Sequence, residues 1–450
     1  MKKYDSYKDS GIEWIGEIPE HWEECRLGVI GGFTSSGIDK KIVEDEPTVK
    51  IINYTDVYGN KEKILNTEKD YMEVTSPQSK INQHSVKKGD LIFTPSSETK
   101  EDIGLSAVVV DDLDNTAFSY HVLRFQFNKE VNLLFKKYLC NNYPVLNYFS
   151  KNSKGTTRQI LGREDFKNAK VVIPPKSEQT AIANFLDLKT SEIDEIIADK
   201  KRLLELYEEE KTAIINQAVT KGINPDVPMK DSGIEWLGEI PEHWEVKRFD
   251  YLFDFSRGLP ITKADLRDTG IPCVSYGEIH SKFGFDVDPN RDLLKCVDDK
   301  YLVTNDKSLL QSGDFVFADT SEDLEGSGNF TYLNSSVPTF AGYHTIIGKP
   351  IIEFERRYVA YYFNTLPFRN QVRSKVSGTK VFSITQAILK FTNIIFPLIS
   401  EQQEIVDYID NECARIDSKK ERTEKLIELL TEYRTALISE VVTGKIKVIE

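Results

Sequence analysis

The sequence predicts an α+β fold with internal pseudo-two-fold symmetry, in which two globular, mainly β domains are connected by two long helices. Three observations support this fold class. A sixteen-residue segment occurs twice, a long helical pattern occurs twice, and the regions between them alternate short strand patterns with turns. A chain of 450 residues is long enough for two to four domains, each with a core of its own.

The repeated segment opens each half of the chain. Residues 8–23 read KDSGIEWIGEIPEHWE and residues 230–245 read KDSGIEWLGEIPEHWE, so the copies differ only at Ile15 and Leu237. All four tryptophans of the protein lie in these two copies. A period near half the chain length indicates two copies of one large unit rather than a solenoid of short repeats.

The second repeat is helical. Residues 177–223 and residues 400–446 both begin with SEQ and end in TKGI or TGKI. Residues spaced alternately by three and four form a heptad stripe, which is typical of a helix that packs on a partner helix. We expect the two helices to pack on each other; the alternative is that each packs on its own globular half. The stripes consist of Ile193, Ile197, Lys200, Leu204, Tyr207, Lys211, Ile214 and Ala218, and of Ile416, Lys419, Thr423, Leu426, Leu430, Tyr433 and Leu437.

Two regions of divergent sequence lie between these repeats, at residues 24–172 and 246–395. Strings such as GDLIFTP, GDFVFAD and HTIIGKP predict short strands separated by turns. A few positions still correspond, so each half is one module with a shared opening, a divergent domain and a shared helix. Corresponding positions include Tyr54 with Tyr276, and Gly155-Thr156 with Gly378-Thr379.

Bulk composition narrows the class of protein. The net charge of −14 argues against a uniformly basic nucleic-acid binder, so charge has to be considered locally. The five cysteines are far apart and form no CxxC pair, which disfavours a zinc site or a disulfide framework and favours a cytoplasmic location. The first lysines precede no apolar stretch, so no signal peptide is expected, and no apolar run is long enough for a membrane span.

Two windows without acidic residues are the sharpest electrostatic feature. Residues 131–163 and residues 356–400 contain no Asp or Glu, although the chain has 72 of them. The windows lie at corresponding places in the two halves and interleave basic residues with tyrosines. Basic side chains neutralise phosphates, so the two windows together favour DNA contact, whereas any single cation fits a solvated face equally well. The cations are Lys136, Lys137, Lys151, Lys154, Arg158 and Arg163, then Arg356, Arg357, Arg369, Arg373, Lys375, Lys380 and Lys390.

The candidate DNA-binding residues come from these windows and from nearby polar loops. The turns SKGTTRQ and VSGTK let the backbone approach phosphates closely. Arg158 and Gln159, or Arg373 and Lys380, carry donors that suit base edges in a major groove. The loops PSSETKEDIG and DTSEDLEGSG offer hydroxyl donors, although a plain surface turn explains them equally well. The candidates are Ser96, Ser97, Lys151, Lys154, Thr156, Thr157, Arg158, Gln159, Arg257, Tyr276, Thr320, Arg369, Arg373, Lys375, Thr379 and Lys380.

Sequence signals for catalysis are missing. The chain has no GxxxxGK[ST] phosphate loop, no GxGxxG, no [Asp/Asn]-Pro-Pro-[Tyr/Phe] string of adenine methyltransferases, and no histidines at metal-ligand spacing. His21 and His243 occur within the repeated segment, which indicates packing rather than chemistry. We therefore expect no catalytic residue, no bound metal and no cofactor held by this chain.

The repeated opening, the variable domain, the GT turn, the SEQ string beside proline, the long helix and the TG or KGI ending together resemble the specificity (S) subunit of type I restriction–modification systems. The resemblance covers the whole chain. It implies that the two helices form an antiparallel coiled coil that spaces two target-recognition domains, and that the subunit is not an enzyme. The implied segments are target-recognition domain 1 at residues 1–172, helical spacer 1 at 173–228, target-recognition domain 2 at 229–395 and helical spacer 2 at 396–450.

The resemblance also implies partners and their cofactors. Specificity subunits bind double-stranded DNA, two methyltransferase (M) subunits that methylate adenine at N6, and restriction (R) subunits that are translocases and nucleases. S-adenosylmethionine, ATP and Mg2+ would be used by those partners, and no membrane contact is expected. One departure is local, since residues 396–398 read FPL where residues 173–175 read IPP.

Helix length and domain divergence predict the form of the DNA target. A helix over residues 189–220 would be about 48 Å long, on the order of 14 base pairs, so two different domains predict a bipartite, asymmetric target with an unread spacer. A scaffold that assembles subunits without reading sequence is the rival, but it does not explain the paired basic windows. A fused methyltransferase is disfavoured by the missing motif. The constant opening segment should pack each domain, so Trp14→Ala or Trp236→Ala should cost stability or assembly and leave the target unchanged.

Overall fold

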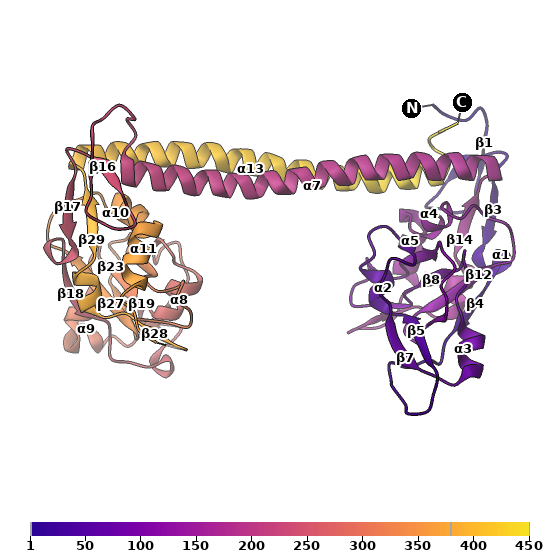
Figure 1. Cartoon of the computed structure of the whole chain (residues 1–450), viewed down its shortest axis with the longest axis horizontal. Helices are drawn as coiled ribbons and strands as arrows, with labels where there is room; N and C mark the ends of the chain where they lie inside the picture. The colour runs from indigo at the N-terminus through magenta and orange to yellow at the C-terminus, as the bar shows by residue number, and fades with distance from the viewer. Residues whose placement is uncertain (1, 379, 450) are drawn as a thin grey trace. The chain divides into compact units, whose positions relative to one another are not determined.

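The computed structural model describes residues 2–378 and 380–449. The chain forms two compact units, one of Met1–Arg202 with Glu424–Glu450 and the other of Leu203–Thr423. Each unit therefore contains one α+β domain and part of both long helices (Figure 1). Within the described residues, no helix combines the length and apolar character needed to cross a membrane.

The domain of the first unit is built on two mixed sheets. The larger has the strand order β4-β12-β8-β10-β6 and the smaller has the order β11-β5-β7. Strand β12 pairs antiparallel with β4 and β8, whereas β6 joins β10 in parallel. The bounds are β3 (Glu23–Arg26), β4 (Gly31–Ser35), β5 (Thr48–Ile52), β6 (Ile64–Leu65), β7 (Met72–Thr75), β8 (Leu91–Phe93), β9 (Ser96–Ser97), β10 (Ser106–Val109), β11 (Thr116–Phe118), β12 (Leu123–Phe127), β13 (Gln159–Ile160) and β14 (Lys170–Ile173).

The domain of the second unit repeats this plan. Its sheets have the orders β18-β27-β23-β25-β20 and β21-β19-β26-β22. The predicted strands GDFVFAD and HTIIGKP are β23 and β27 and pair antiparallel, which confirms them. The bounds are β17 (Glu245–Arg248), β18 (Phe253–Arg257), β19 (Ile271–Val274), β20 (Asp286–Val287), β21 (Lys295–Val297), β22 (Leu309–Leu310), β23 (Phe315–Ala318), β24 (Thr320–Ser321), β25 (Phe330–Leu333), β26 (Thr339–Ala341), β27 (Thr345–Pro350), β28 (Phe382–Ser383) and β29 (Asn393–Phe396).

Some of the short helices lie between a main sheet and the long helices. In the second unit α10 buries Tyr358 and Phe363 in one cluster with Phe315 of the sheet and Ile409 of a long helix. The core therefore continues from the domain into the long helices of its own unit, which fixes the domain's orientation on them. The short helices are α1 (Leu27–Ile30), α2 (Tyr54–Tyr58), α3 (Gln78–His84), α4 (Lys136–Cys140), α5 (Tyr143–Asn152), α6 (Arg163–Asn168), α8 (Tyr276–Ser281), α9 (Tyr301–Thr304), α10 (Arg356–Phe363), α11 (Leu366–Arg373) and α12 (Gln386–Lys390).

The two long helices, α7 (Lys176–Lys221) and α13 (Ile399–Val442), pack antiparallel in each unit (Figure 1). In the first unit Arg434 donates to Asp194 at 3.0 Å, and in the second Lys211 lies 2.9 Å from Asp417. The expected helix pairing is confirmed, and so is the stripe of α7, all of whose members are covered.

The predicted stripe of α13 is wrong at two positions. Leu426 and Tyr433 are 40% and 48% exposed, and Ile427 and Arg434 are the more covered residues. A heptad allows a step of either three or four from Thr423, and the covered face follows the step of four. The sequence alone does not decide between these two steps.

The repeated opening segment binds the start of a long helix through a glutamate. In the first unit the His21-Trp22 pair contacts Glu178, with Trp22 Nε1 donating at 3.0 Å and His21 Nε2 at 2.6 Å from the carboxylate. In the second unit the His243-Trp244 pair contacts Glu401 at 2.9 and 3.0 Å. Both glutamates belong to the SEQ string, so the two sequence repeats bind each other. Two small hairpins complete the opening segments, β1 (Tyr7–Asp9) with β2 (Glu17–Pro19) and β15 (Met229–Asp231) with β16 (Glu239–Pro241).

The second tryptophan of each copy makes this contact, and not the first. Trp22 and Trp244 are fully buried, whereas Trp236 is 42% exposed. Trp14 is half-buried against Tyr148, with 6.0 Å between ring centroids. The packing role expected of Trp14 and Trp236 therefore belongs mainly to Trp22 and Trp244, which donate to the glutamates; in the first unit Tyr4 also donates to Glu178, at 2.8 Å. A role of Trp236 in assembly stays a prediction.

Candidate nucleic-acid interface

The glycine turn of each half forms a short hairpin, closed by a bridge between Lys154 and Ile160 or between Ser377 and Ser383, and its second strand pairs antiparallel with the serine loop, which is far away in sequence. In the first unit β9 pairs with β13, with Ser97 opposite Gln159. In the second unit β24 pairs with β28 (labelled in Figure 1), with Thr320 opposite Ser383. The structure thus brings together candidates from two separate sequence windows, and it does so in the same way in both units.

The glycines of the two turns occupy equivalent positions. Gly155 has φ 129° and Gly378 has φ 154°, and a Cβ on either would lie 2.0 Å from the carbonyl oxygen three residues later. Only glycine fits such a position. The residues beyond these glycines form the exposed tips, which contain Thr156, Thr157 and Arg158 in one unit and Lys380 in the other. Thr379 lies outside the described residues.

Gln159 braces its turn from within. It is buried, its amide donates to the Gly155 carbonyl at 2.7 Å, and its amide oxygen accepts from Ser153 at 3.0 Å. Both functional groups of the amide are therefore used inside the chain, which leaves Arg158 and Lys154 as the exposed cations of this hairpin. Base reading by Gln159 stays a prediction that this geometry does not favour.

Aromatic residues flank the hairpin of the first unit. The Arg158 guanidinium lies over the Tyr54 ring, 5.8 Å from its centroid, and Tyr54 stacks on Tyr58 with 5.2 Å between centroids. Burial raises the pKa of the Tyr54 phenol, against the opposing effects of a hydrogen bond with Ser97 and of the Arg158 charge. Tyr54 was noted in the sequence only as the counterpart of Tyr276, and its nearness to Arg158 had no linear signal.

The remaining candidates of the first unit differ in exposure and in their place on the surface. Ser97 is buried and accepts a hydrogen bond from the Thr99 backbone, whereas Ser96 is half-exposed. Lys151 is exposed and lies over the Trp14 ring, 5.8 Å from its centroid, which places it on the opening segment. Ser96 thus joins the hairpin surface, while Lys151 belongs to a different part of the unit's surface.

In the second unit, Arg257 and Thr320 line one hollow of about 510 Å³ together with His344 and Ser383. Thr320 donates to Asp319 at 2.7 Å, and His344 lies 3.2 Å from the same carboxylate. The hairpin of this unit therefore stands beside a polar hollow with both donors and acceptors.

Tyr276 and His280 line a neighbouring hollow of about 520 Å³ with Asn329. His280 Nε2 lies 2.8 Å from the Thr320 carbonyl oxygen, and Asn329 lies 2.8 Å from His280 Nδ1. Arg369 donates to Asn329 at 2.7 Å. This chain links a predicted cation to the hairpin through two residues that the sequence did not single out, because their positions come from separate loops.

Three predicted cations of the second unit differ in their freedom to bind. Arg369 is half-buried and donates to Asn329 and Asn364. Its partial burial, aided by the Arg373 charge, lowers its pKa to about 10. Arg373 donates to the Glu325 carbonyl at 2.5 Å, and Lys375 donates to the Phe391 carbonyl at 3.0 Å. Lys380 at the hairpin tip is exposed and is the better candidate for phosphate contact.

The first cations of both basic windows hold the domain instead of facing solvent. Lys137 lies 2.6 Å from Asp187 of α7, and Lys136 is buried, donating to the Gly89 carbonyl at 2.8 Å. In the second unit Arg357 makes a bidentate contact with Asp410 of α13. The reading of each whole window as a DNA-facing surface therefore does not hold for Lys137 and Arg357, whose acidic partners lie on the long helices outside the windows, or for Lys136, which donates to a backbone carbonyl.

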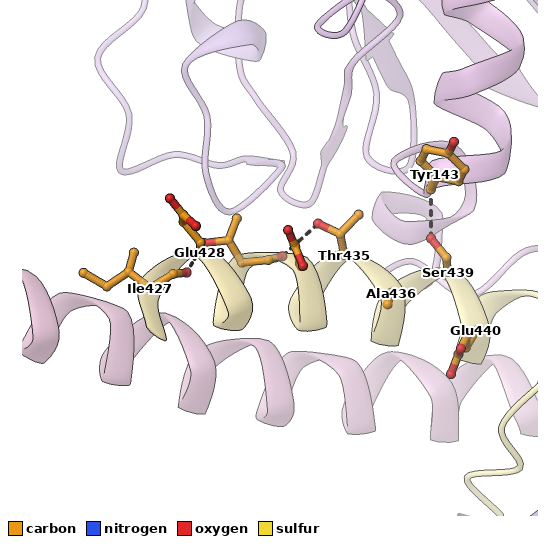
Figure 2. Close-up of a pocket in the computed structure, with 9 residues that line it drawn as sticks. Tyr143, Ile427, Glu428, Thr435, Ala436, Ser439 and Glu440 are labelled. Atoms are coloured by element: carbon orange, nitrogen blue, oxygen red, sulfur yellow. Dashed lines mark hydrogen bonds between the residues drawn. The ribbon is translucent and has the colours of Figure 1, made fainter. Parts of the chain in front are cut away.

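A separate apolar groove lies on α13 in the first unit (Figure 2). It has a volume of about 740 Å³, and the Tyr143 backbone closes one end by donating to Ser439 at 3.1 Å. Glu428, Glu432 and Glu440 also line it. Carboxylates repel phosphates, so this groove does not extend the DNA-binding surface.

Each of the two domains carries a polar hairpin and packs on the long helices of its unit. The two domains together define a two-part recognition protein. No catalytic centre is built among the described residues. The type I restriction modification DNA specificity domain matches residues 19–206 and 241–428. The chain belongs to this family. Membership confirms the predicted class of protein, its fold and its DNA-specificity role.

Two similar proteins can be compared with the chain over its length. The chain is 22% identical over 440 residues to the type I restriction enzyme MjaVIII specificity subunit of Methanocaldococcus jannaschii, covering 96% of this chain and 94% of that one. It is 25% identical over 451 residues to the putative MjaX specificity subunit of the same organism, covering 96% of each. The relatives thus match the chain over nearly its whole length.

Two solved structures share the fold. The HsdS subunit from Thermoanaerobacter tengcongensis has a TM-score of 0.57 at 15% identity, over 95% of this chain and 98% of that chain. A chain in a structure on complex assembly and conformational transition of the type I R-M system has a TM-score of 0.67 at 16% identity, over 95% of this chain and 99% of that chain. At these identities the likeness is evidence for the fold.

Proposed function

We propose that this non-catalytic specificity subunit reads a bipartite, asymmetric DNA target, with one half-site for each domain. One observation carries the proposal. Both units present a hairpin of the same backbone at the same place, but the exposed side chains on the two hairpins differ. A two-stranded β-ribbon fits the major groove, where each base pair has a distinct pattern of donors and acceptors. Two equivalent hairpins with different exposed side chains suit two half-sites of different sequence.

The proposal includes the partners of the type I complex. Two methyltransferase subunits using S-adenosylmethionine would methylate adenine at N6, which requires the base to leave the stack. Restriction subunits would use ATP and Mg2+, and the complex would work in the cytoplasm. The role of this chain is to place those subunits over the correct bases. A scaffold that does not read sequence would have no need for two matched hairpins with different tips.

Mapping of methylated adenines tests this proposal. The full chain is co-expressed with a methyltransferase subunit of its system in a host without other adenine methylation. We expect one motif with two specified blocks separated by an unspecified spacer of fixed length. A single contiguous block, or methylation without any motif, would contradict the bipartite proposal and favour the scaffold.

Reversing one hairpin charge should weaken DNA binding through the phosphate backbone. Lys154→Glu is expected to lower affinity for a target duplex about tenfold at 0.1 M salt, since one phosphate contact adds roughly 0.9 to the slope of log K against log salt. Titration at several salt concentrations measures both quantities. Lys425→Glu on α13 makes the same charge change beside Glu428 and should leave the slope unaltered. Equal slopes for wild type and Lys154→Glu would remove Lys154 from the interface.

A further inference from the structure

We propose that one hairpin-tip position selects a base in each half-site, with Arg158 selecting guanine and Val381 selecting thymine. The inference rests on the proposed function and adds the residue and the base to it. Charge alone does not carry the proposal, because the Val381 side chain is uncharged. The argument depends on the equivalence of the two positions, on what surrounds each side chain, and on the donors and acceptors of the bases.

The two positions are equivalent in backbone geometry. The carbonyl of Arg158 lies over Gly155, and the carbonyl of Val381 lies over Gly378, each 2.0 Å from the position a glycine Cβ would take. Bridges close both turns in the same register, between Lys154 and Ile160 in the first unit and between residues 377 and 383 in the second. A side chain at either position therefore leaves the same point of the same hairpin.

Arg158 is prepared for a planar, bidentate contact. Its side chain is exposed, and its guanidinium lies over the Tyr54 ring. The ring face attracts the cation without accepting its N–H groups as a carboxylate would, so these donors stay available for hydrogen bonds. Guanine presents two acceptors, O6 and N7, on its major-groove edge, and paired N–H donors of arginine match them. The Tyr54 contact restricts the arginine before DNA arrives, which reduces the entropy lost on binding.

Val381 has an apolar side chain without a hydrogen-bond donor, and about half of it is exposed. It lies next to the exposed Lys380 at the hairpin tip. The C5-methyl group of thymine is the apolar feature of the major groove, and an apolar side chain gains by covering it. The aromatic counterpart of Tyr54 is Tyr276, which packs against His344 with 5.3 Å between ring centroids and not against the tip. In the second unit the corresponding tyrosine therefore supports His344, and the reading group at the equivalent tip position is apolar.

The alternative for Arg158 is a phosphate contact, and the two roles give different results. Loss of a phosphate contact weakens binding to all sequences alike and reduces the salt slope by about one. Loss of a guanine contact relaxes preference at a single position and leaves the rest of the motif in place. The sequence preference of an Arg158 variant therefore separates the two roles, even though the variant binds less tightly in either case.

The experiment is a reciprocal exchange in the full chain, Arg158→Val and Val381→Arg, followed by selection from a pool of random duplexes and sequencing. Arg158→Val should lose about 5- to 150-fold preference for guanine at one position of one half-site, and leave the other half-site unchanged. Val381→Arg should replace thymine by guanine at one position of the other half-site. Arg422→Val on α13 makes the same chemical change at an exposed site outside the hairpins and should keep the wild-type motif.

Each outcome decides one question. A wild-type chain that selects no bipartite motif would overturn the proposed function itself. A wild-type bipartite motif that persists in Arg158→Val with a smaller salt slope would make Arg158 a phosphate contact and overturn this inference alone. An unchanged motif in Val381→Arg would overturn the second half of the inference. Tyr54→Phe should retain guanine preference and Tyr54→Ala should reduce it; equal behaviour of the two would remove the ring from the reading group.

Discussion

Trp22→Ala is expected to lower the free energy of unfolding by about 3–5 kcal/mol, the usual cost of removing a fully buried tryptophan. The indole is fully buried and donates to Glu178 at 3.0 Å. It packs edge-on against Tyr4 with 5.6 Å between ring centroids, and it lies close to Gly444 just after α13. The substitution therefore opens a cavity where the start of α7 meets the end of α13 in this unit, and it removes one donor from a buried carboxylate.

Urea unfolding followed by circular dichroism measures this loss, provided that the transition of the first unit is resolved. Trp236→Ala is the matched control, because its ring is 42% exposed and its removal should cost less than about 1 kcal/mol. The DNA target should be unchanged in both variants, since neither tryptophan belongs to a hairpin. Equal destabilisation by the two substitutions would contradict the assignment of the buried contact to the His-Trp pair.

The arrangement of two domains on paired helices could be predicted because the sequence repeats mark the start and the long helix of each half. The two opening segments, the two SEQ strings and the helix stripe are regular enough to predict two units on paired helices. The contact that joins the repeats, from Trp22 to Glu178, could not be predicted, because both residues are constant and nothing in one sequence relates them. The stripe of α13 failed where a step of three and a step of four were equally acceptable, at Leu426 and Tyr433.

The sequence predicted some features of the candidate site and missed others. It missed those that depend on residues far apart along the chain. Each basic window contains a glycine turn that forms an exposed hairpin in the structure, since glycine followed by small polar residues is a local signal for a turn. The windows were misleading at Lys137 and Arg357, because a local charge balance omits acids that fold against it from the helix. Tyr54 and His280 were missed for the same reason, as each meets the hairpin from a separate loop.

Exchange of the second domain is expected to replace one half of the DNA target and keep the other. The structure moves the boundaries of such a graft inward from residues 246–395 to residues 249–392. Strand β17 pairs with β29 at the base of the domain, so both strands belong with the constant part. The reading surface, with β24 and β28, lies wholly within the graft. Methylation at the original motif should disappear, and a hybrid motif with one familiar block should appear.

The graft must also bring its own contacts to α13. Tyr358 is fully buried and donates to the Val219 and Ile395 carbonyls at 3.2 Å each, and Tyr361 donates to Asp410 at 2.9 Å. A donor domain with tyrosine at both positions should give a folded, active chimera, whereas one without the first tyrosine leaves a buried carbonyl unpaired at about 1–3 kcal/mol and one without the second removes a donor from Asp410. Adenine methylation mapping of the two chimeras checks this. If both half-sites change in the folded chimera, or neither does, the domains do not read independently, and the division of the target between the two hairpins is wrong.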